Sequence, residues 1–236
     1  MKVIECKRIN ALTYGSDKNR EFWFVRVDYN DLGATLRDIL TDLSNLSWLE
    51  KFDKSFLRKS FEKNALNTCE KLKEKFFSGE TPLINNAGEY LVSCLAKRAI
   101  VEKLSHLDVP LAELLGRKVV GNPGFDFFTE NLEASMIYCG EAKYVANANP
   151  YNDSLEQINE FVDKEKYLSD LYILNSLVSD KSLTNLSEKV FGVTAAFSST
   201  NIATEQLLKN IVRNVEFKKC NESQDLILVA VNIYEK

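Results

Sequence analysis

Asp126, Glu141 and Lys143 are residue types on which metal-dependent hydrolysis relies, and they stand in segments otherwise rich in strand-forming residues. Glu141 and Lys143 flank a single alanine, so on a β-strand their side chains point to the same face. Ionisable groups on one face of a central strand are costly unless they meet partners, a metal ion or a substrate. We therefore expect a functional site here rather than a packing surface.

The spacing of the two carboxylates fits an antiparallel hairpin. If Asp126 lies opposite Glu141, the turn is centred between residues 133 and 134, within the polar stretch TENLEAS. Carboxylates that lie close together repel each other unless a cation sits between them. Hard oxygen ligands with room for water suit Mg²⁺ or Mn²⁺, and the backbone carbonyl of Ala142 is a further candidate ligand.

A divalent cation at such a site binds a phosphate oxygen and acidifies a water molecule. The neighbouring Lys143 then orients that water or supports the charge that develops. This chemistry is the hydrolysis of a phosphodiester. The alternative is a surface hairpin with a solvated glutamate and lysine, because an aspartate followed by Glu-x-Lys is a weak signal on its own.

The composition argues against several other classes of protein. The 236 residues include one histidine, His106, which removes most Ser-His and Cys-His catalysis and any multi-histidine metal site. The five cysteines are scattered without a C-x-x-C pair, which indicates reduced thiols in the cytoplasm rather than disulfides or a zinc site. We expect no membrane span and no signal peptide. The net charge of −4 argues against coating nucleic acid through bulk charge, but not against a local basic groove.

In the first 80 residues we expect two strands, a helix capped by Asp31 and a lysine-rich helical segment, at 2–12, 21–29, 32–46 and 51–77. The lysine-rich segment carries eight basic and four acidic residues, and Phe52, Phe56, Phe61 and Phe76 recur in it at roughly helical spacing. We interpret it as amphipathic helices with phenylalanines in the core and a solvated lysine face. A phosphate-facing surface is the alternative.

The composition break GETPLINN, at 79–86, is the expected boundary between an accessory or partner-docking region, 1–80, and a core domain, 81–236. The core should contain helices at 87–104, 110–115, about 153–162 with Asp153 or Ser154 as N-cap, 166–178 and 204–214. The core should also contain an apolar piece at 117–121, a polar loop after 178 and a strand at 225–234 that is buried on both faces. Strands mixed with helices predict an α/β or α+β fold, with a mixed central sheet flanked by helices.

The series Asp126, Glu141 and Lys143 resembles the motif of the PD-(D/E)xK, or restriction-endonuclease-like, nuclease superfamily. The motif residues span 88–161, and Asp126 follows a glycine turn formed by Gly121 and Gly124. The Pro-Asp that gives the family its name is absent. Phe125 precedes Asp126, and Pro123 stands three residues before it.

The resemblance assigns roles to the individual residues. It implies that Asp126 and Glu141 hold the metal ion and that Lys143 assists the attacking water. Glu89 stands near the start of the preceding helix, where the family often has another acidic group, and would complete the shell. Gln157 stands on the following helix, where the family often has a glutamine that positions the lysine or the backbone. The five are the candidate catalytic residues, and 81–236 becomes a nuclease core.

More narrowly, GFDF, CGEAKY and LEQINEF resemble the nuclease subunits of Hachiman antiphage systems, the HamA family. That resemblance implies cleavage of DNA in phage defence and a partner helicase of superfamily 2.

Two other functions stay open. The chain could be a catalytically silent nucleic-acid-binding or scaffold subunit with the same fold, or it could act on RNA, because the same metal site cleaves either backbone. Tyr144 is either a core aromatic or a contact to DNA, and Cys139 is interpreted as a packing residue. The sequence contains no phosphate-binding loop for nucleotides.

Overall fold

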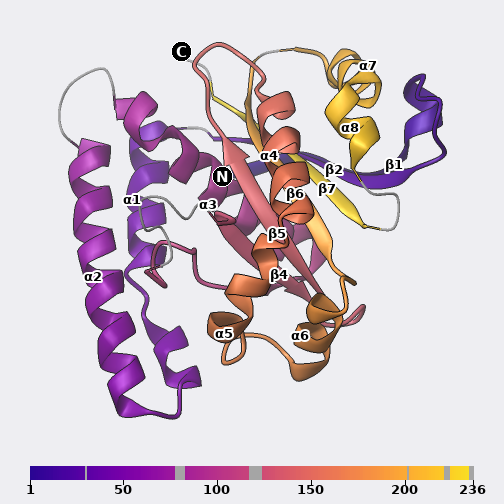
Figure 1. The fold of residues 1–236 in the computed structure, drawn as a ribbon. Helices are drawn as coiled ribbons and strands as arrows, with labels where there is room; N and C mark the ends of the chain where they lie inside the picture. The colour runs from indigo at the N-terminus through magenta and orange to yellow at the C-terminus, as the bar shows by residue number, and fades with distance from the viewer. Residues whose placement is uncertain (30, 78–82, 117–123, 201, 221–223, 234–236) are drawn as a thin grey trace.

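The computed structural model describes residues 1–29, 31–77, 83–116, 124–200, 202–220 and 224–233. Within them the chain forms a mixed α/β fold around one seven-stranded sheet of order β1-β2-β7-β6-β5-β4-β3 (Figure 1). The strands are β1 Lys2–Asn10, β2 Glu21–Asp28, β3 Leu107–Asp108, β4 Phe127–Asn131, β5 Met136–Lys143, β6 Gly192–Ser199 and β7 Leu226–Asn232. A mixed sheet is what the sequence predicts.

The centre of the sheet is parallel. Strands β5, β6, β7 and β2 run in the same direction, whereas β1, β4 and β3 each pair antiparallel with a neighbour. Every residue of β6 and β7 is buried, as expected for parallel strands covered on both faces. The expectation of a buried strand at 225–234 is therefore confirmed for β7.

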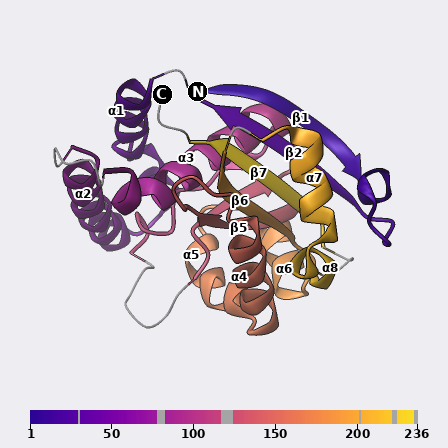
Figure 2. The ribbon, with the colours of Figure 1, turned by 90° about the horizontal axis from the view of Figure 1, so that it is seen from above.

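Helices cover both faces of the sheet. They are α1 Leu32–Leu43, α2 Ser55–Phe77, α3 Leu83–Leu104, α4 Tyr151–Asp163, α5 Leu171–Leu174, α6 Asp180–Ser187, α7 Thr204–Arg213 and α8 Val215–Lys219. Helix α3 packs on one face with α1 and α2 outside it, and α4 with α5 to α8 covers the other face (Figure 2). Two apolar cores, one on each face, hold these layers together.

Several predicted elements are confirmed. Helix α1 begins where expected, and the Asp31 carboxylate accepts the Ala34 N–H as its N-cap. Helix α2 is one amphipathic helix that buries Phe61 and Phe76 and leaves most of its lysines exposed. The phenylalanine pattern fails at Phe56, which is 63% exposed.

Three expectations for the core helices are wrong. The expected helix 110–115 is replaced by turns at 112–116, because the Ala112 N–H donates to the Asp126 carbonyl and Gly116 adopts a positive φ of 74°. The expected helix 166–178 divides into a 3₁₀ turn, Lys166–Asp170, and the short α5. Helix α4 begins at Tyr151 after Pro150, rather than at a cap on Asp153 or Ser154.

The expected polar loop after residue 178 is also wrong. It contains helix α6, whose N-cap is Ser179, and strand β6, which lies in the middle of the sheet. The β6 sequence GVTAAFSS has few large apolar residues, because small side chains suit a strand packed between helices on both faces. A pattern search based on apolar runs therefore misses it.

The two expected regions share one sheet, since β1 and β2 belong to 1–80 and pair with β7 through β2. Helix α3 begins at Leu83, inside the expected boundary segment. Residues 79–82 of that segment and the apolar piece 117–121 lie outside the described residues, so the functional division at residue 80 stays a prediction. Among the described residues, no helix has the length and apolar character to cross a membrane.

Candidate active site at the carboxyl end of strand β5

Strands β4 and β5 form the predicted hairpin in the predicted register. Phe127 pairs with Gly140 and Asn131 with Met136, around a turn at 132–135. The same register places Asp126 opposite Glu141, and the Asp126 N–H donates to the Gly140 carbonyl at 2.9 Å. The hairpin thus brings the two carboxylates to one end of β5.

Asp126 is buried at the point where β4 begins. Its Oδ2 accepts the backbone N–H of Ala142 at 2.8 Å. The side chain thus takes the place of the backbone carbonyl that a neighbouring strand would offer to this N–H. In a strand, the N–H and C=O of one residue point to the same side. The Ala142 carbonyl therefore faces the Asp126 side of β5, where it is placed to act as a ligand beside that carboxylate.

Lys143 is the centre of the charge cluster. Its Nζ lies 3.0 Å from Glu141 Oε1 and 3.6 Å from Glu89 Oε1. Burial is the largest influence and lowers the pKa of Lys143, but Glu141, Glu89 and Asp126 together raise it above the ordinary lysine value. The three carboxylates that the sequence singled out thus converge electrostatically on one ammonium group.

Gly88 allows helix α3 to lie close to the end of β5, where Glu89 meets Lys143. A Cβ at Gly88 would lie 2.2 Å from the ring of Tyr144, the residue after Lys143. Helix α3 can therefore approach the end of β5 this closely only with glycine at this position. Tyr144 is partly buried and packs on the apolar core below α3, which favours the core-aromatic interpretation.

Helix α4 fixes the other side of β5. The Ser154 hydroxyl is buried and donates to the Glu141 carbonyl at 3.0 Å, a contact that the sequence analysis missed by treating Ser154 as a cap. Gln157 follows Ser154 by one helical turn and is partly buried. Within the described ranges it forms no hydrogen bond, so its positioning role stays a prediction.

The segment that leaves β5 is fastened to the end of β6, which no pattern in the sequence indicated. Ser198 Oγ lies 3.1 Å from both the N–H and the carbonyl oxygen of Val145. The amide oxygen of Asn149 accepts from the Ser199 hydroxyl and the Thr200 N–H, each at 3.0 Å. These bonds hold the path from Lys143 to helix α4 in place.

The donor set suits a hard divalent cation. Asp126, Glu141 and the Ala142 carbonyl offer oxygen donors at one strand end, with the exposed carboxylate of Glu89 beyond Lys143. Among the described residues, no three His, Cys, Asp or Glu side chains come close enough to hold an ion by themselves. A cation held by two carboxylates and one backbone carbonyl would keep several waters, as Mg²⁺ commonly does.

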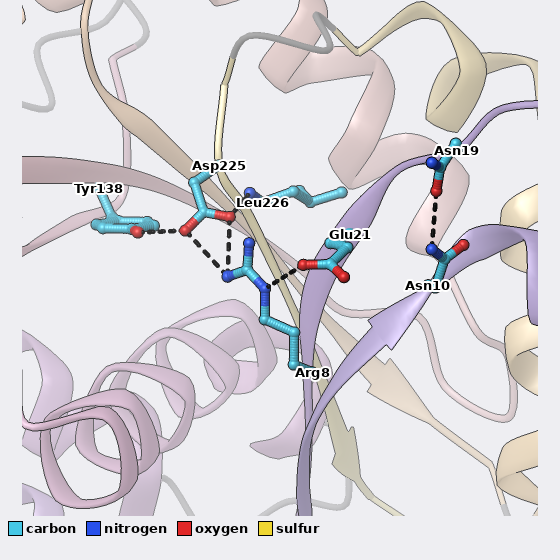
Figure 3. Close-up of polar contacts among 7 residues, drawn as sticks. All are labelled: Arg8, Asn10, Asn19, Glu21, Tyr138, Asp225 and Leu226. Atoms are coloured by element: carbon cyan, nitrogen blue, oxygen red, sulfur yellow. Dashed lines mark hydrogen bonds and ion pairs between the residues drawn. The ribbon is translucent and has the colours of Figure 1, made fainter.

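A second polar cluster lies at the opposite end of β5 (Figure 3). The Tyr138 hydroxyl donates to Asp225 Oδ2 at 2.7 Å, and Arg8 Nη1 lies 3.4 Å from Asp225 Oδ1. Arg8 Nε also donates to Glu21 at 3.3 Å. Burial, and then the bond to Asp225, raise the pKa of Tyr138. Every group drawn in this chain of contacts meets a protein partner, which indicates a structural role.

Two further residues of the sequence analysis are also structural. His106 is buried, with Nδ1 3.0 Å from the Thr129 hydroxyl and its ring 4.7 Å from that of Tyr138. Its burial lowers its pKa to about 4. Cys139 is fully buried, and burial raises its pKa well above the ordinary thiol value, which confirms it as a packing residue.

Comparisons of the chain with protein-family models, with curated proteins and with solved structures find no match. The chemistry of the site is therefore inferred from its residues and their geometry.

Proposed function

We propose that the chain is a metal-dependent deoxyribonuclease with a restriction-endonuclease-like core. The observation that carries the proposal is the hairpin register, which sets Asp126 opposite Glu141 beside the ammonium of Lys143. Glu141 is 1% exposed, and burying a carboxylate and an ammonium costs free energy that folding alone does not require. Such a cluster is typical of a site kept for its chemistry.

In this proposal Asp126, Glu141 and the Ala142 carbonyl hold Mg²⁺ or Mn²⁺. The bound cation supplies a polarised phosphate oxygen and a more acidic water. Lys143 donates hydrogen bonds and positive charge to the water or the phosphate, and Glu141 and Glu89 hold its ammonium in position. Ser154 fixes the backbone of Glu141, and Gln157 is proposed to position Lys143 or the backbone.

We further propose that the chain acts in the cytoplasm, in antiphage defence, as a subunit beside a superfamily 2 helicase. The resemblance to the Hachiman nuclease subunits is one support. The net charge of −4 is a second, because an acidic enzyme binds DNA weakly and gains from a partner that delivers it. A third is that helix α2 in the accessory region exposes Phe56 and Leu66, at 63% and 50%, as apolar contacts for a partner.

The test is cleavage of plasmid and linear DNA in Mg²⁺, Mn²⁺ or EDTA, with and without a helicase encoded beside the chain. The wild type should be compared with Glu141→Ala plus Lys143→Ala, and an RNA of the same sequence should be included. Metal-dependent cutting of DNA that the double substitution abolishes is the expected result. No cutting under any condition, with the helicase present, would favour the silent scaffold. Preferential cutting of RNA would mean that RNA, rather than DNA, is the substrate.

A further inference from the structure

Helix α2 concentrates positive charge in an otherwise acidic protein. Its 23 residues contain six basic side chains and three acidic ones, for a net charge of +3. Since the whole chain carries −4, the remainder carries −7. Charge so unevenly distributed marks the helix as the surface that attracts an anionic ligand.

In the part of the chain that the structure describes, the cations of α2 are also not paired with carboxylates. Within the described ranges, none of the six forms an ion pair, whereas Lys164, directly after α4, and Lys209 on α7 each pair with a glutamate four residues earlier. The three glutamates of α2 are thus not used to neutralise its basic side chains. Ammonium groups without protein anions are ready to bind phosphates.

Two of these lysines line a groove between α2 and α3. The groove has a volume of about 270 Å³, and its lining includes Lys71, Lys75, Asn64, Asn67, Thr68 and Tyr90. Lys75 Nζ lies 5.1 Å from the centre of the Tyr90 ring, a cation–π distance that holds the ammonium at the groove. Among the described residues of the lining, the buried Glu113 is the one acidic side chain beside the two lysines, which gives these residues a net charge of +1.

The groove and the candidate active site meet helix α3 at consecutive residues. Tyr90 directly follows Glu89, and the Glu89 carboxylate lies 3.6 Å from Lys143 Nζ. From Tyr90 the lining continues along α2 through Lys75 and Lys71, which are one helical turn apart. The groove and the Glu89–Lys143 pair are therefore near each other along α3.

We propose that the α2–α3 groove binds the sugar–phosphate backbone of a single nucleic-acid strand that enters or leaves the active site. This inference deepens the proposed function and rests on it. Lysines bind phosphates as point charges, amide and hydroxyl groups donate to phosphate and sugar oxygens, and an aromatic ring accepts a base. The lysines, asparagines and threonine of the lining suit a sugar–phosphate backbone, whereas an acidic peptide would need more apolar lining than Leu72 and the Tyr90 ring provide.

The experiment measures binding without chemistry. A labelled single-stranded DNA of about 20 nucleotides, longer than the roughly 4–16 that a compact single-strand site covers, is titrated in EDTA with the full chain. The groove variant is Lys71→Glu plus Lys75→Glu. The matched variant, Lys59→Glu plus Lys63→Glu, makes the same change of charge on the same helix, about 18 Å away. Thermal unfolding checks that both variants fold.

The groove variant should bind at least about tenfold more weakly, with a salt slope reduced by about 1.4 because two phosphate contacts are lost. The matched variant should bind within about threefold of the wild type, because Lys59 and Lys63 lie outside the groove and attract the DNA only through a screened, long-range interaction. Equal losses in the two variants, no binding by the wild type, or tighter binding of duplex or of an acidic peptide would each overturn the proposal.

Cleavage by the same preparations in Mg²⁺ separates the two proposals. Binding that depends on the groove, without cleavage, would refute the proposed nuclease and leave the groove as a binding site. Cleavage that does not depend on Lys71 and Lys75 would refute the groove and leave the nuclease.

Discussion

Strand β5 and its neighbours carry a polar cluster at each end, and the two clusters are built differently. At the amino end of β5, Tyr138 and Asp225 form a chain of contacts with Arg8, and Glu130 on β4 accepts the N–H and the hydroxyl of Ser179. At the carboxyl end, Asp126 and Glu141 converge with Glu89 on the single ammonium of Lys143. The first arrangement joins different elements of the fold, whereas the second concentrates like charges.

The difference predicts whether each cluster serves stability or activity. A hydrogen bond that links β5 to the start of β7, or β4 to the start of α6, stabilises the fold, so its loss should appear in unfolding. Three carboxylates that share one ammonium keep an excess of negative charge unless a further cation binds. Substitution of one of them should therefore lower activity rather than stability. Substitutions of the same kind at the two ends test this division.

The largest effect is expected from the two buried or half-buried aspartates. Asp126→Asn keeps an oxygen that can accept the Ala142 N–H but removes the negative charge, and should slow DNA cleavage at least about a hundredfold. Asp225→Asn keeps an acceptor for Tyr138, weakens the pair with Arg8, and should cost about 1 kcal/mol of stability without slowing cleavage by folded protein. Rates in Mg²⁺ and unfolding in urea distinguish the two, and equal effects on cleavage would contradict the division.

The next effect concerns acid stability at the amino end. His106 has a folded pKa of about 4, below its ordinary 6.5, so protons bind the unfolded state first. The neutral His106 therefore contributes to the free energy of unfolding. The contribution is fully present above pH 6.5, is lost as the pH falls toward 4, and amounts to about 3 kcal/mol in total. His106→Gln should flatten the fall of the unfolding free energy between these two values. A wild-type curve with no slope there would show that His106 is not held neutral.

A smaller effect tests the approach of α3 to the site. Gly88→Ala would place a methyl group 2.2 Å from the Tyr144 ring, and should cost about 1–3 kcal/mol and displace Glu89. The matched Gly124→Ala, whose Cβ meets no described residue within 4 Å, should be nearly neutral. Thermal unfolding compares the pair. A neutral Gly88→Ala would mean that the position of α3 is not set by this contact.

The smallest effect is expected at the rim of the site. Glu89 is half-exposed and lies 3.6 Å from Lys143, compared with 3.0 Å for Glu141. Glu89→Gln should therefore slow cleavage by about tenfold at most, because solvent screens its interaction and Glu141 still holds the ammonium. Single-turnover rates with saturating DNA measure this, and a loss as large as that of Asp126→Asn would promote Glu89 to a metal ligand.

The local part of this architecture could be predicted from the sequence. The hairpin register follows because two apolar segments flank one polar turn, which leaves little choice of pairing. The Asp31 cap and the amphipathic α2 follow from spacing in the same way. These features depend on residues that are close in the chain.

The long-range part could not be predicted. Strand β6 pairs in parallel through crossovers, and its small residues carry no apolar alternation. Tyr138 and Asp225 are 87 residues apart, and the contact of Gly88 with Tyr144 becomes visible only when α3 is packed on the sheet. Sequence patterns report which face of an element is apolar, but not which distant group lies against it.

The most direct test compares two buried glutamates of the same hairpin, at its opposite ends, in Mg²⁺-dependent DNA cleavage. Glu141→Gln and Glu130→Gln are the same isosteric change, and in the second variant the new side-chain amide would still offer an oxygen to Ser179. We predict that Glu141→Gln folds normally and loses cleavage by at least about a hundredfold, while Glu130→Gln retains the wild-type rate per folded molecule. Full activity in Glu141→Gln would contradict the assignment of the active site to the carboxyl end of β5.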